Sequence, residues 1–268
     1  MWTITELLQN FFTHKDFLPS GDQIPGTLFT PMHILFAVVL TAVTAGLVFL
    51  VSRQKEKTIR RVFIGMWIFV VVLEITKILW ETCCGASVKF EWTGTLPLYP
   101  CSIFMYVFPL AIWGKGNVRH AACGYICSLG LLGGLVNFVY PANVLNNYSC
   151  LSFAGMQTLL YHGNLVFCAC AMLASGYHRY TGITKGYQLL LPSIPFLVVS
   201  VFANLVNFSP VNADYMFFKL DSFFFAPIGA ALPKWACVMI VYAAYLFIHA
   251  LPYLPSYFAN RCKSKSAR

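Results

Sequence analysis

Charge is scarce in this sequence. Asp, Glu, Lys and Arg make up 10% of the 268 residues, whereas hydrophobic residues make up 59%, and the mean hydropathy is +0.69. Soluble domains carry about 25% charged residues, so this composition excludes a soluble globular protein. The sequence predicts a polytopic membrane protein whose length suits roughly six to eight spans and leaves no room for a separate soluble domain.

Segments of about ten residues that alternate in polarity are also missing, which excludes a transmembrane β-barrel. The sequence contains instead uncharged runs about twice that long, apolar on all faces, which predict membrane-spanning helices. We expect an all-α membrane protein, a bundle of seven transmembrane helices. These spans are expected near residues 32–52, 62–82, 95–114, 120–140, 153–175, 187–208 and 235–254.

Basic residues are unevenly distributed among the connections between these spans. Loops rich in Lys and Arg stay on the cytoplasmic side of a membrane. Thirteen of the 18 basic residues fall in the first, third and fifth connections and the tail, four fall in the other parts outside the spans, and Lys77 lies inside a span. The sequence therefore predicts an N-terminus outside or in a lumen and a cytoplasmic C-terminus. This role in topology explains the net charge of +9, so no nucleic-acid partner is expected.

The N-terminal region, residues 1–31, has several charges and a short apolar stretch. Thr3 and Glu6 have the spacing of a helix capping box, and Leu7 and Leu8 follow. This pattern predicts a short interfacial helix, and the charges of the segment together with its short apolar run argue against a cleaved signal peptide. The expected organisation is an extracytoplasmic segment over 1–31, a seven-helix domain over 32–254 and a basic cytoplasmic tail over 255–268.

The sequence contains ten cysteines, but no CxxC pair that is accompanied by a pair of histidines. A structural zinc site is therefore not expected. Cysteines within apolar spans are interpreted as small hydrophobic residues. Cys83, Cys84 and Cys150 lie on the predicted outer side, where an oxidising compartment would permit one disulfide, for example between Cys150 and either of the other two. The cysteines assigned to spans by this interpretation are Cys123, Cys127, Cys168, Cys170 and Cys237.

The second span is unusual because it carries three charged residues. Glu74, Lys77 and Glu81 have spacings of i, i+3 and i+7, which place them on one face of a helix. An isolated charge opposes insertion at this depth by about 2.5–3.5 kcal/mol. Two interpretations follow: Glu74 and Lys77 form an internal pair that holds the bundle together, or they belong to a binding or catalytic site.

Polar residues of six spans are expected at similar depth, in the half of the membrane away from the cytoplasm, when depth is counted at about 1.5 Å per residue. Two of them, Cys101 and His162, are a nucleophile and a base of the kind used in covalent acyl transfer. A thiol needs a neighbouring base or cation to become a thiolate, and His162 or Lys77 would serve. The residues of this layer are His33, Glu74, Lys77, Cys101, Ser102, Asn137, His162, Asn164 and Asn204.

The stretch Leu96-Pro97-Leu98-Tyr99-Pro100-Cys101-Ser102 resembles the LPLxxCS signature of the YwaF-like integral membrane family. The resemblance covers residues from about 30 to 250. Two departures stand out: Tyr99 occupies a position where many relatives carry His, and Asp214 one where they carry Asn. The other landmarks that match in order are His33, Glu74 with Lys77, Tyr161-His162-Gly163, and Asp214-Tyr215-Met216-Phe217-Phe218-Lys219 followed by Pro233.

The wider relatives of this family include a vertebrate transmembrane acyltransferase acting on ether phospholipids, and more distant ones of the androgen-induced hydrolase type use an intramembrane Thr and His. The resemblance implies that Cys101 attacks a lipid ester, that His162 shuttles the proton, and that the acyl group rests as a thioester before transfer to a lysophospholipid. Lys77 would hold a phosphate or stabilise the oxyanion, and Glu74 would orient Lys77. The substrates are then membrane phospholipids that enter beneath the aromatic stretch 223–225, and no soluble cofactor is needed.

A membrane transporter or channel remains an alternative, because a Glu–Lys–His cluster at mid-membrane also suits an ion relay. Prolines at 192, 195 and 227 would suit the broken helices of such proteins. Inverted repeats, which would support this reading, are not evident in the two halves. A seven-span receptor is disfavoured, because the sequence lacks a DRY-like triplet after the third span and an NPxxY-like stretch in the seventh.

Overall fold

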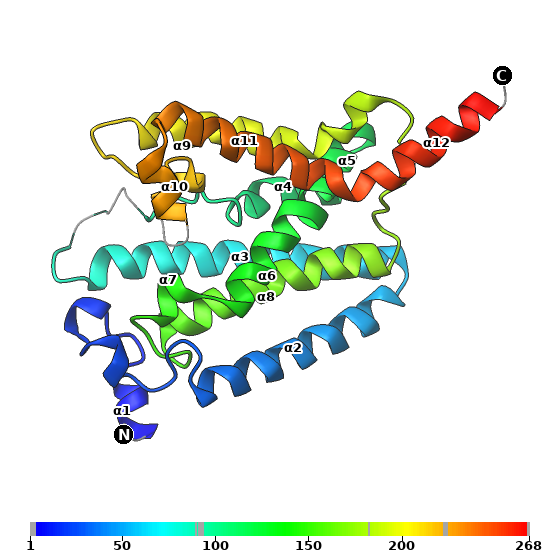
Figure 1. The fold of residues 1–268 in the computed structure, drawn as a ribbon. Coiled ribbons are helices and arrows are strands. Elements are labelled where there is room, and N and C mark those ends of the chain that lie inside the picture. Colours follow the sequence, from blue (N-terminus) through cyan, green and yellow to red (C-terminus); the bar gives the residue numbers. More distant parts are fainter. Residues whose placement is uncertain (1–3, 89, 91–93, 182, 222–224, 267–268) are drawn as a thin grey trace. The chain divides into compact units, whose positions relative to one another are not determined.

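The computed structural model describes residues 4–88, 90, 94–181, 183–221 and 225–266 (Figure 1). All regular structure in these ranges is helical. Within this described part of the chain, six helices are long and apolar enough to cross a membrane, and the protein is therefore an integral, multi-pass membrane protein. These six segments are Pro31–Ser52, Glu56–Cys84, Gly116–Leu145, Phe153–Ala174, Gly186–Asn207 and Lys234–Cys262.

The third expected span, over 95–114, corresponds to the shorter helix α4 (Ile103–Trp113) of 11 residues. This helix is about 16 Å long, roughly half the thickness of a hydrocarbon core. Pro97 and Pro100 disfavour helical backbone in the residues that precede them, and residues 96–102 form turns. The count of seven spans and the orientation of the termini therefore stay predictions.

The chain forms two compact units. Unit 1 comprises Met1–Glu91 and Leu131–Ser175, and unit 2 comprises Trp92–Gly130 and Gly176–Arg268. The expected division into a segment, a bundle and a tail stays a prediction. Of the aromatic stretch 223–225, Phe223 and Phe224 lie outside the described residues.

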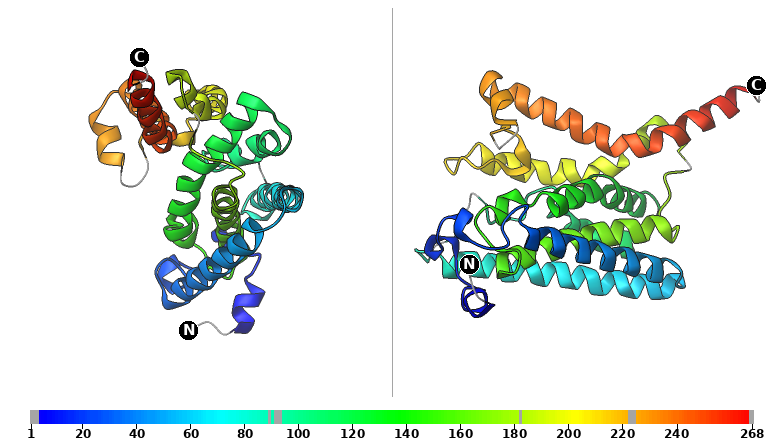
Figure 2. Two further views of the ribbon diagram at one scale, coloured as in Figure 1. Left: turned by 90° about the vertical axis from the view of Figure 1, so that its right-hand side faces the viewer. Right: turned by 60° about the horizontal axis from the view of Figure 1, so that its bottom comes forward.

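Unit 1 is built around α8 (Phe153–Ala174), which packs against α2 (Pro31–Ser52), α3 (Glu56–Cys84) and α6 (Leu131–Val139) (Figure 1, Figure 2). Most side chains of α8 are buried, whereas His33 is the buried residue of α2. The hydroxyl of Thr30 accepts a hydrogen bond from the backbone N–H of His33 at 3.4 Å and caps α2. The remaining apolar surface of α2 is exposed, as expected for a helix facing lipid.

The N-terminal part of unit 1 contains α1 (Ile4–Gln9), η1 (Lys15–Phe17) and η2 (Gly21–Gln23). It is attached to the end of α3. The indole of Trp80 donates to the carbonyl of Phe12 at 2.8 Å, and the imidazole of His14 lies 3.2 Å from the carboxylate of Glu81. Glu81, expected as one of three charges on a common face, therefore binds the N-terminal segment. The short α7 (Ala142–Leu145) completes the unit.

In unit 2, α4 packs against α5 (Gly116–Tyr125), and α5 packs against η5 (Leu191–Ser193) and α9 (Ile194–Asn207). The π-helical turn η3 (Ile126–Gly130) extends α5 and contacts α11 (Lys234–Ala250). Gly124 permits a close approach here, because a Cβ atom would lie 2.5 Å from the hydroxyl of Tyr253. The other elements of this unit are η4 (Gly186–Leu189), η6 (Tyr215–Phe217), α10 (Ala226–Ala231), η8 (Leu251–Tyr253) and α12 (Leu254–Ser266).

All ten cysteines are free thiols. Cys150 is buried, whereas Cys83 and Cys84 are exposed at the end of α3. The disulfide that the sequence would permit among these three is therefore not formed.

Candidate functional site

His162 lies on α8 in unit 1 and is buried. Its Nδ1 atom is 2.7 Å from the backbone carbonyl of Thr158, one turn earlier. Because a carbonyl oxygen only accepts hydrogen bonds, Nδ1 carries the proton and Nε2 carries the lone pair. This Nε2 atom is buried and has no hydrogen-bond partner among the described residues. The imidazole is thus held in the tautomer whose Nε2 atom can accept a proton.

A charged pair lies beside this histidine. On α3, the ammonium of Lys77 is 2.7 Å from the carboxylate of Glu74, and the two side chains are 26% and 4% exposed. Lys77 also interacts electrostatically with His162. Unit 1 therefore brings together three of the residues selected from the sequence.

The side chains of His33 and Asn137 form hydrogen bonds with nearby backbone groups of the chain. The Nδ1 atom of His33 accepts a hydrogen bond from the backbone N–H of Phe29 at 3.0 Å. The side-chain amide of Asn137 donates to the carbonyl of Gly133 in its own helix, also at 3.0 Å. Among the described residues, no hydrogen bond joins either side chain to Lys77 or His162.

Asn164 has a structural role. Its side-chain amide donates to the backbone carbonyl of Met66 at 3.1 Å and so fastens α8 to α3. An interhelical bond of this kind satisfies a polar group that would otherwise be costly within hydrocarbon.

Cys101 belongs to unit 2, in the turn that leads into α4, and is half-buried. The backbone N–H of Ser102 donates to the carbonyl of Tyr99 at 2.9 Å, which closes this turn. The Ser102 side chain is 4% exposed. The thiol of Cys101 interacts electrostatically with three phenols, those of Tyr99, Tyr125 and Tyr245.

One of these phenols also fixes the backbone next to the thiol. The hydroxyl of Tyr125 donates to the carbonyl of Pro100 at 2.7 Å, and this side chain is completely buried. The hydroxyl of Tyr245 donates to the carbonyl of Met216 at 3.2 Å. Two of the three phenols that interact with Cys101, those of Tyr125 and Tyr245, are therefore positioned by hydrogen bonds to other segments.

A distant segment supports the same turn. The hydroxyl of Tyr215 accepts a hydrogen bond from the backbone N–H of Leu96 at 3.0 Å, and its ring lies 5.0 Å from that of Tyr99. The side chain of Asn207 accepts from the backbone N–H of Tyr215 at 2.7 Å and donates to its carbonyl at 2.8 Å. Two landmarks of the sequence resemblance thus meet within unit 2.

Asp214 stabilises this segment. Its carboxylate accepts hydrogen bonds from the backbone N–H groups of Lys219, at 2.7 Å, and Asp221, at 3.4 Å. Burial raises the pKa of this carboxyl above its ordinary value, and the two N–H donors oppose that effect. An asparagine would offer one acceptor oxygen here, whereas the carboxylate of Asp214 offers two. The acid therefore supplies a second hydrogen-bond acceptor for the loop.

Asn204 lies away from these loops, on α9. Its side-chain amide donates to the hydroxyl of Tyr242 at 3.1 Å, and this hydroxyl is 2.9 Å from that of Ser200. These bonds join α9 to α11, whereas the Oδ1 atom of Asn204 is buried and has no hydrogen-bond partner among the described residues.

The sequence did not indicate which residues contact the two candidate residues, Cys101 and His162. Thr158 stands one helical turn before His162, a spacing that could have indicated it. Tyr125 and Tyr245 lie in separate apolar segments, so no spacing links them to Cys101. Cys101 lies in unit 2 and His162 in unit 1.

Comparison with known proteins places these observations in a family. The model of the TMEM164 family matches residues 28–253. This range includes all the candidate residues described above. No curated protein and no solved structure matches the chain.

Proposed function

The chain belongs to the TMEM164 family, and we propose that it is a membrane acyltransferase that moves a fatty acyl group between phospholipids. Cys101 is the proposed nucleophile and His162 the proposed general base. The observation that carries the proposal is the state of His162, whose Nδ1–H is bonded to the Thr158 carbonyl at 2.7 Å. A buried imidazole with this tautomer is ready to accept a proton through Nε2.

The first half of the proposed reaction forms the acyl-enzyme. His162 takes the proton of the Cys101 thiol, and the thiolate attacks the ester carbonyl of a phospholipid. A carbon–sulfur bond forms and the ester carbon–oxygen bond breaks. The leaving alkoxide takes the proton from His162, so a lysophospholipid departs and a thioester remains.

The second half reverses these steps with another acceptor. The hydroxyl of a second lysophospholipid gives its proton to His162 and attacks the thioester. The carbon–sulfur bond breaks, and the Cys101 sulfur recovers the proton. Water as the acceptor would make the same machinery a lipid-ester hydrolase.

Lys77 is the proposed electrostatic partner of the lipid. A cation near the reacting ester would stabilise the oxyanion that forms on attack, or hold the phosphate of the substrate. Glu74, 2.7 Å from the ammonium, fixes the position of Lys77. Cys101 is partly exposed, and the charged side chains of Glu74 and Lys77 are largely buried. These exposures support a reaction at the level of the lipid chains.

Transport through the Glu74–Lys77–His162 cluster is the second candidate, and the buried ion pair on α3 favours it. One experiment separates the two functions. Purified protein in liposomes receives a phospholipid with an isotope-labelled acyl chain and an unlabelled lysophospholipid, and the products are analysed by mass spectrometry. We expect label in the acceptor, lost in Cys101→Ala. Proton flux that survives Cys101→Ala but fails in Glu74→Gln, without acyl transfer, would establish the transporter instead.

A further inference from the structure

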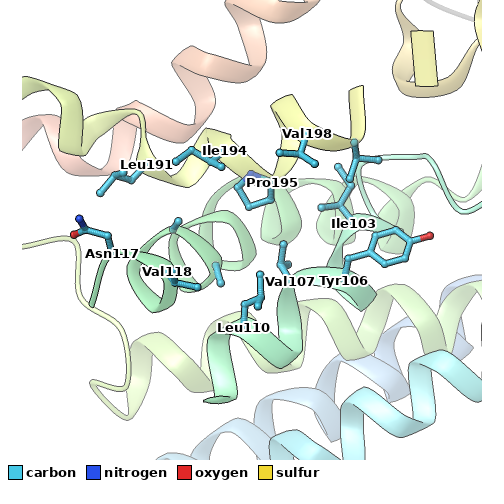
Figure 3. A pocket seen from close by; sticks show the side chains of 13 residues that line it. Ile103, Tyr106, Val107, Leu110, Asn117, Val118, Leu191, Ile194, Pro195 and Val198 are labelled. Atoms are coloured by element: carbon cyan, nitrogen blue, oxygen red, sulfur yellow. The ribbon is translucent and has the colours of Figure 1, made fainter. Parts of the chain in front are cut away.

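Unit 2 contains an apolar groove of about 370 Å³ between α4, α5, η5 and α9 (Figure 3). Its floor includes Ile103 and Val107, which are buried, and one rim is formed by Val198, which is 55% exposed. Tyr106 and Asn117 are the polar side chains among the residues that line it, and Figure 3 shows them at opposite ends. An open groove with these walls within a membrane protein fits a hydrocarbon chain.

The groove is separate from the surroundings of Cys101. Ile103 lines the groove, whereas Cys101 and Ser102, which precede it in the turn, do not. The phenols of Tyr99, Tyr125 and Tyr245 interact with the thiol, and none of them lines the groove. A ligand in the groove would therefore occupy a different place from the reacting acyl group.

Two basic residues flank Asn117 in the sequence, beside the end of the groove that Asn117 lines. Lys115 is exposed and precedes Asn117 by two residues. The guanidinium of Arg119, two residues after Asn117, lies 4.2 Å from the ring of Tyr177, whose hydroxyl donates to the carbonyl of Ala111 at 3.2 Å. Arg119 is thus held near the turn between α4 and α5.

No carboxylate balances this charge in the surrounding sequence. The chain has no acidic residue between Glu91 and Asp214. In unit 2, Asp214 and Asp221 both lie in the loop between α9 and α11, where Asp221 pairs with Lys234 at 2.6 Å. The end of the groove beside these basic residues is therefore complementary to an anion.

We propose that this groove binds one phospholipid of the anionic class, with an acyl chain along α4 and the phosphate at Lys115 and Arg119. An apolar groove alone would admit the chain of any lipid. Basic residues at the membrane surface attract anionic headgroups with about 1 kcal/mol for each charge, which corresponds to roughly fivefold in binding. The headgroup charge is the property that selects this ligand.

Photo-crosslinking tests the site without reference to acyl transfer. The full-length protein is placed in nanodiscs of phosphatidylcholine that contain a small fraction of a probe with a diazirine in its acyl chain. The probe is either phosphatidic acid or phosphatidylcholine with the same chain. After illumination, the labelled peptides are mapped by mass spectrometry. We expect phosphatidic acid to label residues 103–122 and 191–199 several-fold more strongly than phosphatidylcholine.

Three variants sharpen the test. Lys115→Gln should lower labelling by phosphatidic acid roughly fivefold and leave labelling by phosphatidylcholine unchanged. Val198→Trp should block the groove and remove labelling by both probes. Val39→Trp is the matched control, because Val39 is similarly exposed, at 52%, on α2, and it should change neither. Equal labelling by the two probes, labelling that survives Val198→Trp in a folded protein, or equally strong labelling of residues 34–50 would overturn the proposal.

Discussion

The phenol of Tyr215 accepts a hydrogen bond from the backbone N–H of Leu96 at 3.0 Å, across 119 residues of sequence. This bond joins the loop after α9 to the turn that carries Cys101. The turn has little regular structure of its own, so contacts of this kind hold the candidate nucleophile in place. Residues far along the chain from Cys101 thereby support the candidate site.

Tyr215→Phe is expected to destabilise unit 2. The change leaves the N–H of Leu96 without its acceptor, and an unsatisfied donor in a partly buried place costs about 1–3 kcal/mol. The midpoint of thermal unfolding in detergent should fall. Tyr187→Phe provides the control, because Tyr187 is 55% exposed and its loss should have little effect. Equal midpoints for the two variants would show that the Tyr215 bond contributes nothing.

His162→Gln is expected to reduce acyl transfer by about 10²–10⁴-fold, the usual contribution of a general base. The protein should still fold, since glutamine is polar and of similar size. Thr158→Val makes a matched comparison, because it removes the hydroxyl 3.3 Å from Nδ1 but keeps the carbonyl that fixes the tautomer. Transfer should fall only slightly in this variant. Full activity in His162→Gln would remove the histidine from the mechanism.

The two members of the ion pair on α3 should respond unequally to mutation. Lys77→Met leaves the carboxylate of Glu74 unpaired, and this side chain is 4% exposed; Glu74→Gln leaves an ammonium that is 26% exposed. Removing one partner of a buried pair costs about 3–5 kcal/mol. We expect the larger drop in unfolding temperature for Lys77→Met and partial recovery when both changes are combined. A larger drop for Glu74→Gln would contradict this account.

Stability should decrease in acid because of His178, which lies between α8 and η4. Its Nε2 is 2.7 Å from the hydroxyl of Tyr253, and burial, with smaller effects of His120 and Arg119, lowers its pKa from 6.5 to about 4. The unfolded chain takes up this proton as the pH falls below 6.5, whereas the folded protein resists until about pH 4. The folded state therefore loses on the order of 3 kcal/mol across this window.

Thermal midpoints measured between about pH 7.5 and 4.5 test this effect. His178→Gln cannot titrate, so its midpoint should fall less steeply with pH than that of the unmodified protein. Other buried histidines titrate in both proteins and cancel in the comparison. Parallel curves for the two proteins would show that His178 does not contribute.

The helical membrane fold could be predicted from long apolar runs, because hydrophobic length is a local property. The third span was not confirmed as predicted, since hydropathy does not detect that Pro97 and Pro100 keep residues 96–102 out of a helix. The ion pair of Glu74 and Lys77 followed from helical spacing, and the structure confirms it at 2.7 Å.

Contacts between distant segments were beyond prediction. Tyr125, Tyr215 and Tyr245 resemble ordinary membrane tyrosines in the sequence, and only folding brings them to the turn of Cys101. Asn137 and Asn204 were selected because polar groups in spans are costly, and they stay predicted site residues. Each side-chain amide donates a local or interhelical hydrogen bond, whereas the Oδ1 atom of Asn204 is buried without a hydrogen-bond partner among the described residues.

Trapping of the acyl-enzyme tests the central claim most directly. The purified protein in lipid is incubated with a phospholipid whose acyl chain is labelled, then denatured at acid pH and analysed by intact mass and peptide mapping. The account predicts a thioester on Cys101 that is released by hydroxylamine, is absent in Cys101→Ala and is retained in Cys123→Ala, where the thiol removed is buried on α5. Equal labelling of the two variants, or no label on Cys101 in a protein that transfers acyl groups, would contradict it.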